Sequence, residues 1–311
     1  MIVPGGKFPP IELMERKMSK QDYSRRDFLR ICGLTTVVSA CGPAVCGRAA
    51  EAKKPLFRFA VASDLHYGQV KTPFTETTEN LVGWLNAEKK TKGLDLIILN
   101  GDLVHDSVNG YAELKGKHLK KLKTPYYTTK GNHDFVDGKP GSPGESWKKI
   151  WGYDANHVVR MGKLGFILAD TSAPMDGGPY LAADIDWLKK QIAALGDADA
   201  IFVFMHIAQR KRGVQNWPKW GLKRQKQIVA GEAVMAFLES QKKVRAIFHG
   251  HDHNSTSRLI SGGKPYFFDS HIGGSFGNKK GYRIVEIYAG DKISTYQCEG
   301  ETRKIMNTHT L

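Results

Sequence analysis

The chain has 311 residues, of which 41% are hydrophobic and 25% are charged. That composition is typical of a packed globular protein and excludes an intrinsically disordered one. No apolar stretch reaches the ~18 residues that a membrane-spanning helix needs. Lysine and arginine outnumber aspartate and glutamate by 46 to 31, which gives a net charge of +15. Four cysteines are too few for a disulfide scaffold at this length.

The first 52 residues have the layout of an export signal. Arg25 and Arg26 precede a hydrophobic pair, an uncharged and weakly apolar run follows from 31 to 47, and residues 50–52 (Ala-Glu-Ala) offer a cleavage site. The arginine pair resembles that of a bacterial twin-arginine signal. We therefore expect residues 1–52 to be signal and linker, and the protein to be exported to the periplasm or cell envelope by the twin-arginine machinery. The alternative is an amphipathic N-terminal helix, but nothing in this segment repeats at helical spacing.

Two details of this signal stay open. The segment before the arginine pair is long, so translation starts at Met1 or at Met18. Residues 38–41 (Val-Ser-Ala-Cys) resemble a lipobox, so the signal ends either after Ala52 or before Cys41. A lipid on Cys41 would hold the protein at a membrane surface. We expect membrane attachment only in that case.

Residues 53–311 are expected to form a single domain. They hold 38 basic and 26 acidic residues, a net charge of +12 that would attract small phosphorylated anions. Nucleic acid is not an expected partner, because the basic residues are scattered and no RNA- or DNA-binding motif is present. Only Cys298 lies in this part of the chain, so it has no internal disulfide.

Short apolar runs rich in β-branched or aromatic residues alternate with helical patterns along this domain. Such runs predict buried strands at residues 56–62, 94–99, 164–169, 201–205 and 244–248. Apolar residues at helical spacing predict helices over 76–90, 185–195 and 226–241. The tail, residues 265–298, reads as an all-β meander. Alternating strands and helices followed by such a meander predict a layered α/β domain.

Polar residues follow these strands at the points where ligands bind in α/β sheets. Asp64 and His66 come after the first strand, spaced so that both side chains can reach one ion. Each block taken alone is weak, this one included, since a Gly-Asp pair is usually a turn and a lone histidine is usually a satisfied polar residue. The later blocks are, in chain order, Asp102, then Asn132-His133-Asp134 after an apparent strand at 125–129, then His206, then His251 and His253.

The series in this order resembles the calcineurin-like metallophosphoesterases, whose pattern is D-x-H, G-D, G-N-H-D/E, H and G-H-x-H. The resemblance covers residues 57–288 and is most specific at 131–134 and 250–253. It implies that residues 53–311 are one metallophosphoesterase domain. The expected fold is α/β, a four-layer α/β/β/α sandwich of two mostly mixed β-sheets flanked by helices.

The resemblance also implies two metal ions. One would be held by Asp64, His66 and His253, and the other by Asn132, His206 and His251. Asp102 would bridge them. Carboxylate, imidazole and amide ligands suit Fe, Mn or Zn, and the sequence does not choose among these metals.

The activity that the resemblance implies is hydrolysis of phosphoric mono- or diesters. Two metals would activate a bridging hydroxide for attack on phosphorus. His133 would assist the leaving group, and Asp134 would orient the His133 ring, although a loop-capping carboxylate is an alternative role for Asp134. Histidines and an aspartate near the motifs are expected beside the centre or in solvent rather than as ligands. These are His105, Asp106, His249 and His271.

The segment after His206 is rich in cations and tryptophans. Arg210, Arg212 and Trp217 are candidate substrate-binding residues, and a solvated basic loop is the alternative. Two other functions stay open: a non-catalytic phosphate- or polyanion-binding envelope protein on the same fold, and a nuclease. The complete ligand set together with His133 favours the enzyme. Monoester and diester substrates are not separated by the sequence.

Overall fold

The structure is a computed structural model of the chain. It describes residues 54–106, 109–134, 144–172, 182–209, 228–256, 258–269, 271–277 and 279–311. These belong to one compact unit, Lys53–Leu311. The predicted signal with Cys41 lies outside the described residues, as do Arg210, Arg212 and Trp217. Among the helices of the described ranges, none is long and apolar enough to cross a membrane.

The first of two β-sheets has six strands in the order β12-β11-β10-β1-β2-β3. Its parallel strands are β1 (Phe57–Ala62), β2 (Leu96–Asn100) and β3 (Tyr126–Thr129). Its antiparallel strands are β10 (Gly281–Ile287), β11 (Ile293–Glu299) and β12 (Ile305–Thr310). The parallel half of the sheet carries its carboxyl strand ends along one edge.

The second sheet also has six strands, in the order β4-β5-β6-β7-β9-β8. Its parallel core consists of β5 (Leu164–Ala169), β6 (Ala200–Met205), β7 (Val244–His249) and β9 (Lys264–Phe268). The edge strands β4 (His157–Met161) and β8 (Arg258–Ser261) are antiparallel to their neighbours. Both sheets are therefore mixed.

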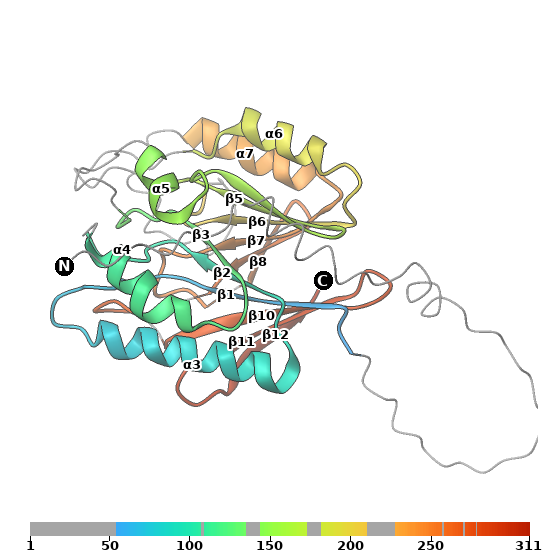
Figure 1. Cartoon of the computed structure of the whole chain (residues 1–311). Coiled ribbons are helices and arrows are strands. Elements are labelled where there is room, and N and C mark those ends of the chain that lie inside the picture. Colours follow the sequence, from blue (N-terminus) through green and yellow to red (C-terminus); the bar gives the residue numbers. More distant parts are fainter. Residues whose placement is uncertain are drawn as a thin grey trace, which may run out of the picture. The chain divides into compact units, whose positions relative to one another are not determined.

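Helices cover the outer faces of the two sheets (Figure 1). On the first sheet lie α3 (Phe74–Lys92) and α4 (Asn109–Glu113), the latter continued by the π-helical turn η1 (Leu114–His118) and the 3-10 turn η2 (Leu119–Lys121). On the second sheet lie α6 (Ile185–Ala194) and α7 (Ile228–Ser240). The short α5 (Gly144–Trp151) packs with Trp147 and Trp151 in the cluster of the first sheet. Asp184 caps α6, because its side chain accepts hydrogen bonds from the backbone of Asp186 and Trp187.

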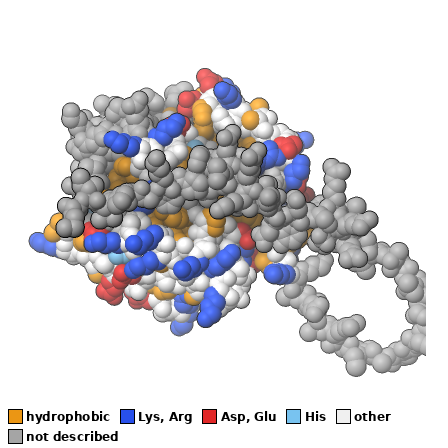
Figure 2. Space-filling model, viewed as in Figure 1, with side chains coloured by type: hydrophobic (Ala, Val, Ile, Leu, Met, Phe, Trp, Pro, Cys, Tyr) orange, Lys and Arg blue, Asp and Glu red, His pale blue; other side chains and the backbone are white. Residues whose placement is uncertain are grey.

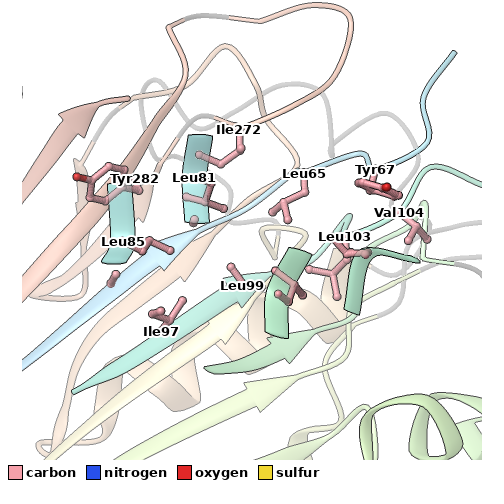
Figure 3. Close-up of a cluster of buried hydrophobic side chains, with 14 of the residues drawn as sticks. Leu65, Tyr67, Leu81, Leu85, Ile97, Leu99, Leu103, Val104, Ile272 and Tyr282 are labelled. Carbon is pink, nitrogen blue, oxygen red and sulfur yellow. The ribbon is translucent and has the colours of Figure 1, made fainter. Parts of the chain in front are cut away.

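Three apolar clusters fill the spaces between these layers. The cluster between the sheets is mainly aromatic, and the Phe59 ring lies edge-on to Phe166 and Phe202 at 5.2 and 5.0 Å. A second cluster packs α3 against the first sheet and includes Leu81, Leu85, Ile97, Leu99 and Tyr282 (Figure 3). The third packs α6 and α7 against the second sheet. Three cores between four layers confirm the expected α/β/β/α sandwich.

The period-two alternation of a strand is visible in β1. Phe59 and Val61 face the core between the sheets, whereas Ala60 and Ala62 face the helical layer. A strand buried on both faces is apolar throughout, which is why the sequence showed it as a continuous run.

The tail of the chain is all-β as expected, but it is not one meander. Strand β9 joins the second sheet next to β7, whereas β10, β11 and β12 form the antiparallel half of the first sheet. Two connected strands in different sheets cannot be recognised from local alternation, because pairing is a tertiary property.

Candidate metal centre

The predicted ligands meet at the carboxyl ends of five strands. Asp64 and His66 follow β1, Asp102 follows β2 and Asn132 follows β3 in the first sheet. In the second sheet His206 follows β6, and His251 and His253 follow β7. Backbone hydrogen bonds join the first two loops, since Asp64 N–H donates to Gly101 O and His66 N–H to Asp102 O, both at 2.9 Å. The structure thus draws residues up to about 190 positions apart onto one edge.

One group of candidate ligands consists of Asp64, His66 and His253, whose ligand atoms all lie within 4.8 Å of one another. Nε2 of His253 lies 3.1 Å from Oδ1 of Asp64 and 3.0 Å from Nε2 of His66. All three side chains are buried. These are the three residues expected to share one metal ion.

A second group consists of Asp102, His206 and His251, which also lie within 4.8 Å of one another. Asp102 occupies the position between the groups. Its Oδ2 lies 3.2 Å from Nε2 of His206 and 3.6 Å from Nε2 of His66, while its Oδ1 accepts the His133 N–H at 2.8 Å. Oδ2 of Asp102 therefore faces one histidine of each group, which is the position that a bridging ligand needs.

Asn132 supplies a test of whether a cation fits here. Its side chain is 9% exposed, and its Oδ1 is buried without a hydrogen-bond partner among the described residues. A buried amide oxygen that is left unpaired is costly, so such an atom calls for an explanation. A cation would satisfy it, and the ligand atoms of the two groups are carboxylate oxygens and imidazole nitrogens, which suit divalent or trivalent metal ions. The residues present fit a pair of metal ions.

Hydrogen bonds to backbone carbonyls fix the orientation of two histidines. Nδ1 of His206 lies 2.7 Å from Asn100 O, and Nδ1 of His253 lies 3.1 Å from Phe276 O. Because a carbonyl only accepts, each Nδ1 carries the proton and each Nε2 is left as the ligand atom. Nδ1 of His66 faces Nδ1 of His105 at 2.9 Å. His249 points elsewhere, with its Nδ1 donating to Met205 O at 2.9 Å.

The backbone is strained at four of the candidate ligands. Asp64, His66, Asp102 and His251 have φ values of 56°, 46°, 51° and 66°. Side chains with a Cβ rarely adopt this left-handed region, and each such residue costs on the order of 1–3 kcal/mol. Strain that clusters at polar strand ends is typical of a functional site.

Two glycines of the motifs make room for the ligands. A Cβ on Gly250 would lie 2.7 Å from Oδ2 of Asp64 and 2.8 Å from Nδ1 of His206. A Cβ on Gly131 would collide with the backbone nitrogen and Oδ1 of Asp102. The motif glycines are therefore required by close approach of the ligand side chains.

The buried charges of the centre balance one another. Burial would raise the pKa of the Asp64 carboxyl, but the His206 and His253 rings hold that pKa well below its usual range. Burial lowers the pKa of His206, but Asp102 and Asp64 outweigh it and raise the pKa to about 10. The carboxylates are thus ionised. A metal ion that binds to the imidazole nitrogens would displace their protons into solvent.

His133 lies at the rim of the centre, with 27% of its side chain exposed. Its Nδ1 lies 2.6 Å from Oδ1 of Asp106, and its ring stacks on His105 at 4.6 Å. Burial lowers the pKa of His133, but the Asp102 and Asp106 carboxylates outweigh burial and raise it to about 9. An imidazole held by a carboxylate beside the candidate ligands is positioned to donate a proton to a bound group.

Asp134 does not orient the His133 ring, which corrects the expectation from the sequence. Its Oδ1 accepts hydrogen bonds from Leu103 N–H, Val104 N–H and the Tyr111 hydroxyl at 2.8 to 3.0 Å, and its Oδ2 accepts from Gly131 N–H at 2.8 Å. Asp134 therefore fastens the loop after β2 to the loop after β3, which is the loop-capping alternative. The orienting position belongs to Asp106, which the sequence placed only near the motifs.

A four-layer α/β/β/α sandwich with two adjoining groups of Asp and His donors at its strand ends is typical of metal-dependent hydrolases. A family model described as calcineurin-like phosphoesterase matches residues 57–255, which is more than half of the chain. The chain therefore belongs to the calcineurin-like phosphoesterase family, whose members are ester hydrolases.

The chain is similar to one curated protein and to several solved structures. A probable glycerophosphodiester phosphodiesterase GpdQ from Arcobacter nitrofigilis is 25% identical over 169 residues, 53% of this chain and 59% of that protein, so the chain spans about three-fifths of this relative. A dimetal phosphatase from Danio rerio has 12% identity and a TM-score of 0.58, covering 82% of this chain and 98% of that chain. The purple acid phosphatase PPD1 from yellow lupin seeds has 14% identity and a TM-score of 0.60, covering 82% and 53%.

Proposed function

We propose that this chain is an exported, metal-dependent hydrolase of phosphate mono- or diesters in which His133 protonates the leaving group. The observation that carries the proposal is the position of the His133–Asp106 pair beside the two donor groups. A centre of that composition binds an anionic phosphoryl group, and the imidazole at its rim supplies a proton. Ester hydrolysis needs both the phosphoryl-binding centre and the proton donor.

The residues that would hold two metal ions are the predicted set. Asp64, His66 and His253 would hold one ion, Asn132, His206 and His251 would hold the other, and Asp102 would bridge them. Bound metal ions would supply Lewis acidity for the phosphoryl oxygens and a water of lowered pKa as nucleophile. Fe, Mn and Zn all suit these donors.

The chain's own contribution to the reaction is proton delivery. Asp106 accepts from Nδ1 of His133, which leaves Nε2 as the ring atom that can donate to the leaving oxygen. The Asp106 carboxylate stabilises the imidazolium before transfer and holds the ring during it. After transfer the neutral ring can be reprotonated from water, because His133 is partly exposed.

The non-catalytic alternative explains less of the structure. A protein that only held phosphate would need cations, but it would not need an imidazole positioned by a carboxylate at the rim. On the face in Figure 2, Lys and Arg side chains lie among hydrophobic, acidic and other side chains. The sequence has no nucleic-acid-binding motif, so a nuclease is the weaker alternative.

The relatives leave two substrate classes open, phosphate monoesters and phosphate diesters. The Arcobacter relative is described as a probable diesterase and the Danio rerio structure as a phosphatase, so both classes enter the test. The purified chain is loaded with Mn, Fe or Zn and assayed on p-nitrophenyl phosphate and bis(p-nitrophenyl) phosphate, with Asp102→Asn as the matched control. We expect turnover of at least one ester by the wild type and none by the control. Turnover that persists in the control would contradict the proposal.

Export is the second component of the proposal. Its support is the arginine pair and the weakly apolar run of residues 1–52. A protein exported folded would keep metals acquired before export. Replacing Arg25 and Arg26 by lysine should retain the precursor in the cytoplasm, as measured by fractionation and immunoblotting. Normal export of that variant would contradict twin-arginine export while leaving the hydrolase proposal intact.

A further inference from the structure

Phe276 combines exposure with contact to a candidate ligand. Its side chain is 58% exposed, although it is a large hydrophobic residue. Its ring lies on the His253 ring with 4.7 Å between centroids and an interplanar angle of 22°, and its carbonyl accepts from Nδ1 of His253. One face of the phenyl ring therefore covers a candidate ligand, while more than half of the residue's surface is open to solvent.

The His253 ring is already packed on its other side. His271 stacks on it at 4.6 Å with an interplanar angle of 2°, and His271 is buried. Two rings that are nearly parallel to a third at these distances must lie on its opposite faces. His253 thus lies between a buried ring and an exposed one, and the exposed one is at the side that a solute can reach.

Val70 is a second exposed apolar residue, on a loop that is hydrogen-bonded to the loop of Phe276. It is 79% exposed and lies in the loop after β1, four residues beyond the ligand His66. Its neighbour Gln69 donates from Nε2 to Oγ of Ser275 at 3.3 Å. Since Ser275 precedes Phe276, this hydrogen bond holds the two loops side by side. Val70 follows Gln69 and Phe276 follows Ser275, the two residues that join the loops. We refer to Val70 and Phe276 together as the apolar rim.

We propose that the apolar rim binds the organic group of the phosphoester, and that it favours esters of aromatic or bulky apolar alcohols over esters of small polar ones. This rests on the proposed function. The phosphoryl group would lie at the charged centre, and Phe276 lies one imidazole ring away from it. An aromatic group seated there would stack on the phenyl ring and remove Val70 from water, whereas a small polar alcohol would gain little from either contact.

The competing explanation is that the Phe276 ring serves only to hold His253 in place. The two explanations differ in which substrates respond to its removal. A ring that only positions His253 affects metal binding and all esters alike. A ring that contacts the organic group affects ligands that carry an aromatic group and spares those that lack one.

Binding of phenylphosphonate and methylphosphonate to the metal-loaded protein, measured by calorimetry, separates the two. We expect the wild type to bind phenylphosphonate more tightly. Phe276→Ala should weaken phenylphosphonate by about tenfold and methylphosphonate by less than about twofold, with unchanged metal content. Phe276→Tyr, which keeps the ring, should retain the preference, and Val70→Ser should reduce it in part. Ile305→Ser removes an apolar residue of similar exposure on the edge strand β12 and should change nothing.

The outcomes are distinguishable from failure of the proposed function. Equal weakening of both phosphonates by Phe276→Ala, loss of metal from that variant, or a wild type without preference would each overturn the apolar rim while ester hydrolysis persists. A wild type that binds neither phosphonate and hydrolyses no ester would overturn the proposed function, and the apolar rim with it.

Discussion

Nδ1 of His133 lies 2.6 Å from Oδ1 of Asp106, and the two residues come from loops that follow different strands of the first sheet. The carboxylate fixes which ring nitrogen is occupied and stabilises the charged imidazole. Asp106 itself has a left-handed backbone, with φ of 56°. The loop after β2 is thus bent so that it contributes Asp102 to the ligands and Asp106 to the candidate acid.

Replacing Asp106 should reduce turnover without removing metal. His133→Ala should lower kcat by ~10²–10⁴ because it removes the proton donor. Asp106→Asn should lower kcat by ~10–100-fold, because the ring keeps a partner but loses the charge that stabilises its protonated form. Steady-state kinetics and elemental analysis check both variants. A rise in KM at constant kcat, or loss of metal, would show that Asp106 acts in some way other than through His133.

Asp134 should behave as a structural residue. Asp134→Ala would leave the buried N–H groups of Leu103, Val104 and Gly131 without their acceptor, and each unsatisfied donor costs about 1–3 kcal/mol. We expect a loss of roughly 3–5 kcal/mol in the free energy of unfolding, measured by urea denaturation. A variant of normal stability with a kcat as low as that of His133→Ala would restore the catalytic role for Asp134.

Gly250 should be required for metal binding rather than for folding. In Gly250→Ala the new methyl group would press on Asp64 and His206, so metal affinity should fall by ~10–100-fold. Gly83, in α3, is the matched control, since a Cβ there meets nothing within 4 Å. Gly83→Ala should stabilise the protein by about 0.5–1 kcal/mol and leave the metal affinity unchanged. Equal metal affinities of the two variants would refute the close-approach argument.

The buried pair of Arg58 and Glu88 should make stability depend on pH. Nη2 of Arg58 lies 2.7 Å from Oε2 of Glu88, and both side chains are buried. Burial alone would raise the pKa of Glu88, but the hydrogen bond from Arg58 and its charge lower it below the ordinary 4.5. A carboxyl whose folded pKa is lowered stabilises the fold above its unfolded pKa, and this stability is lost as pH falls through the folded value.

Glu88→Gln should therefore destabilise the protein at neutral pH, and by progressively less as the pH falls below ~4.5. Urea denaturation at several pH values measures this difference. Glu113, whose ion pair with Lys117 is on the surface, is the control, and Glu113→Gln should change little at any pH. A deficit of Glu88→Gln that is constant down to the acid transition would contradict the linkage.

The sequence predicted the parallel strands and their polar ends because both have local signals. A strand buried on both faces is an apolar run, as in β2 and β6, and a ligand must follow it directly. The edge strands β4, β8 and β12 were missed because they are partly exposed and carry no such run. The hydrogen-bond partner of the His133 ring could not be predicted from the sequence either. Whether Asp106 or Asp134 reaches the ring depends on how two loops from separate strands fold against each other.

The most direct test of the account is metal stoichiometry. Elemental analysis of the purified wild type after loading with Fe, Mn or Zn should give about two ions per chain, as two adjoining donor groups require. Asp102→Asn should hold fewer than two ions per chain and should hydrolyse no ester, because the oxygen shared between the groups loses its charge. A wild type that takes up no metal under any loading condition would contradict the central claim that these strand ends form a binuclear centre.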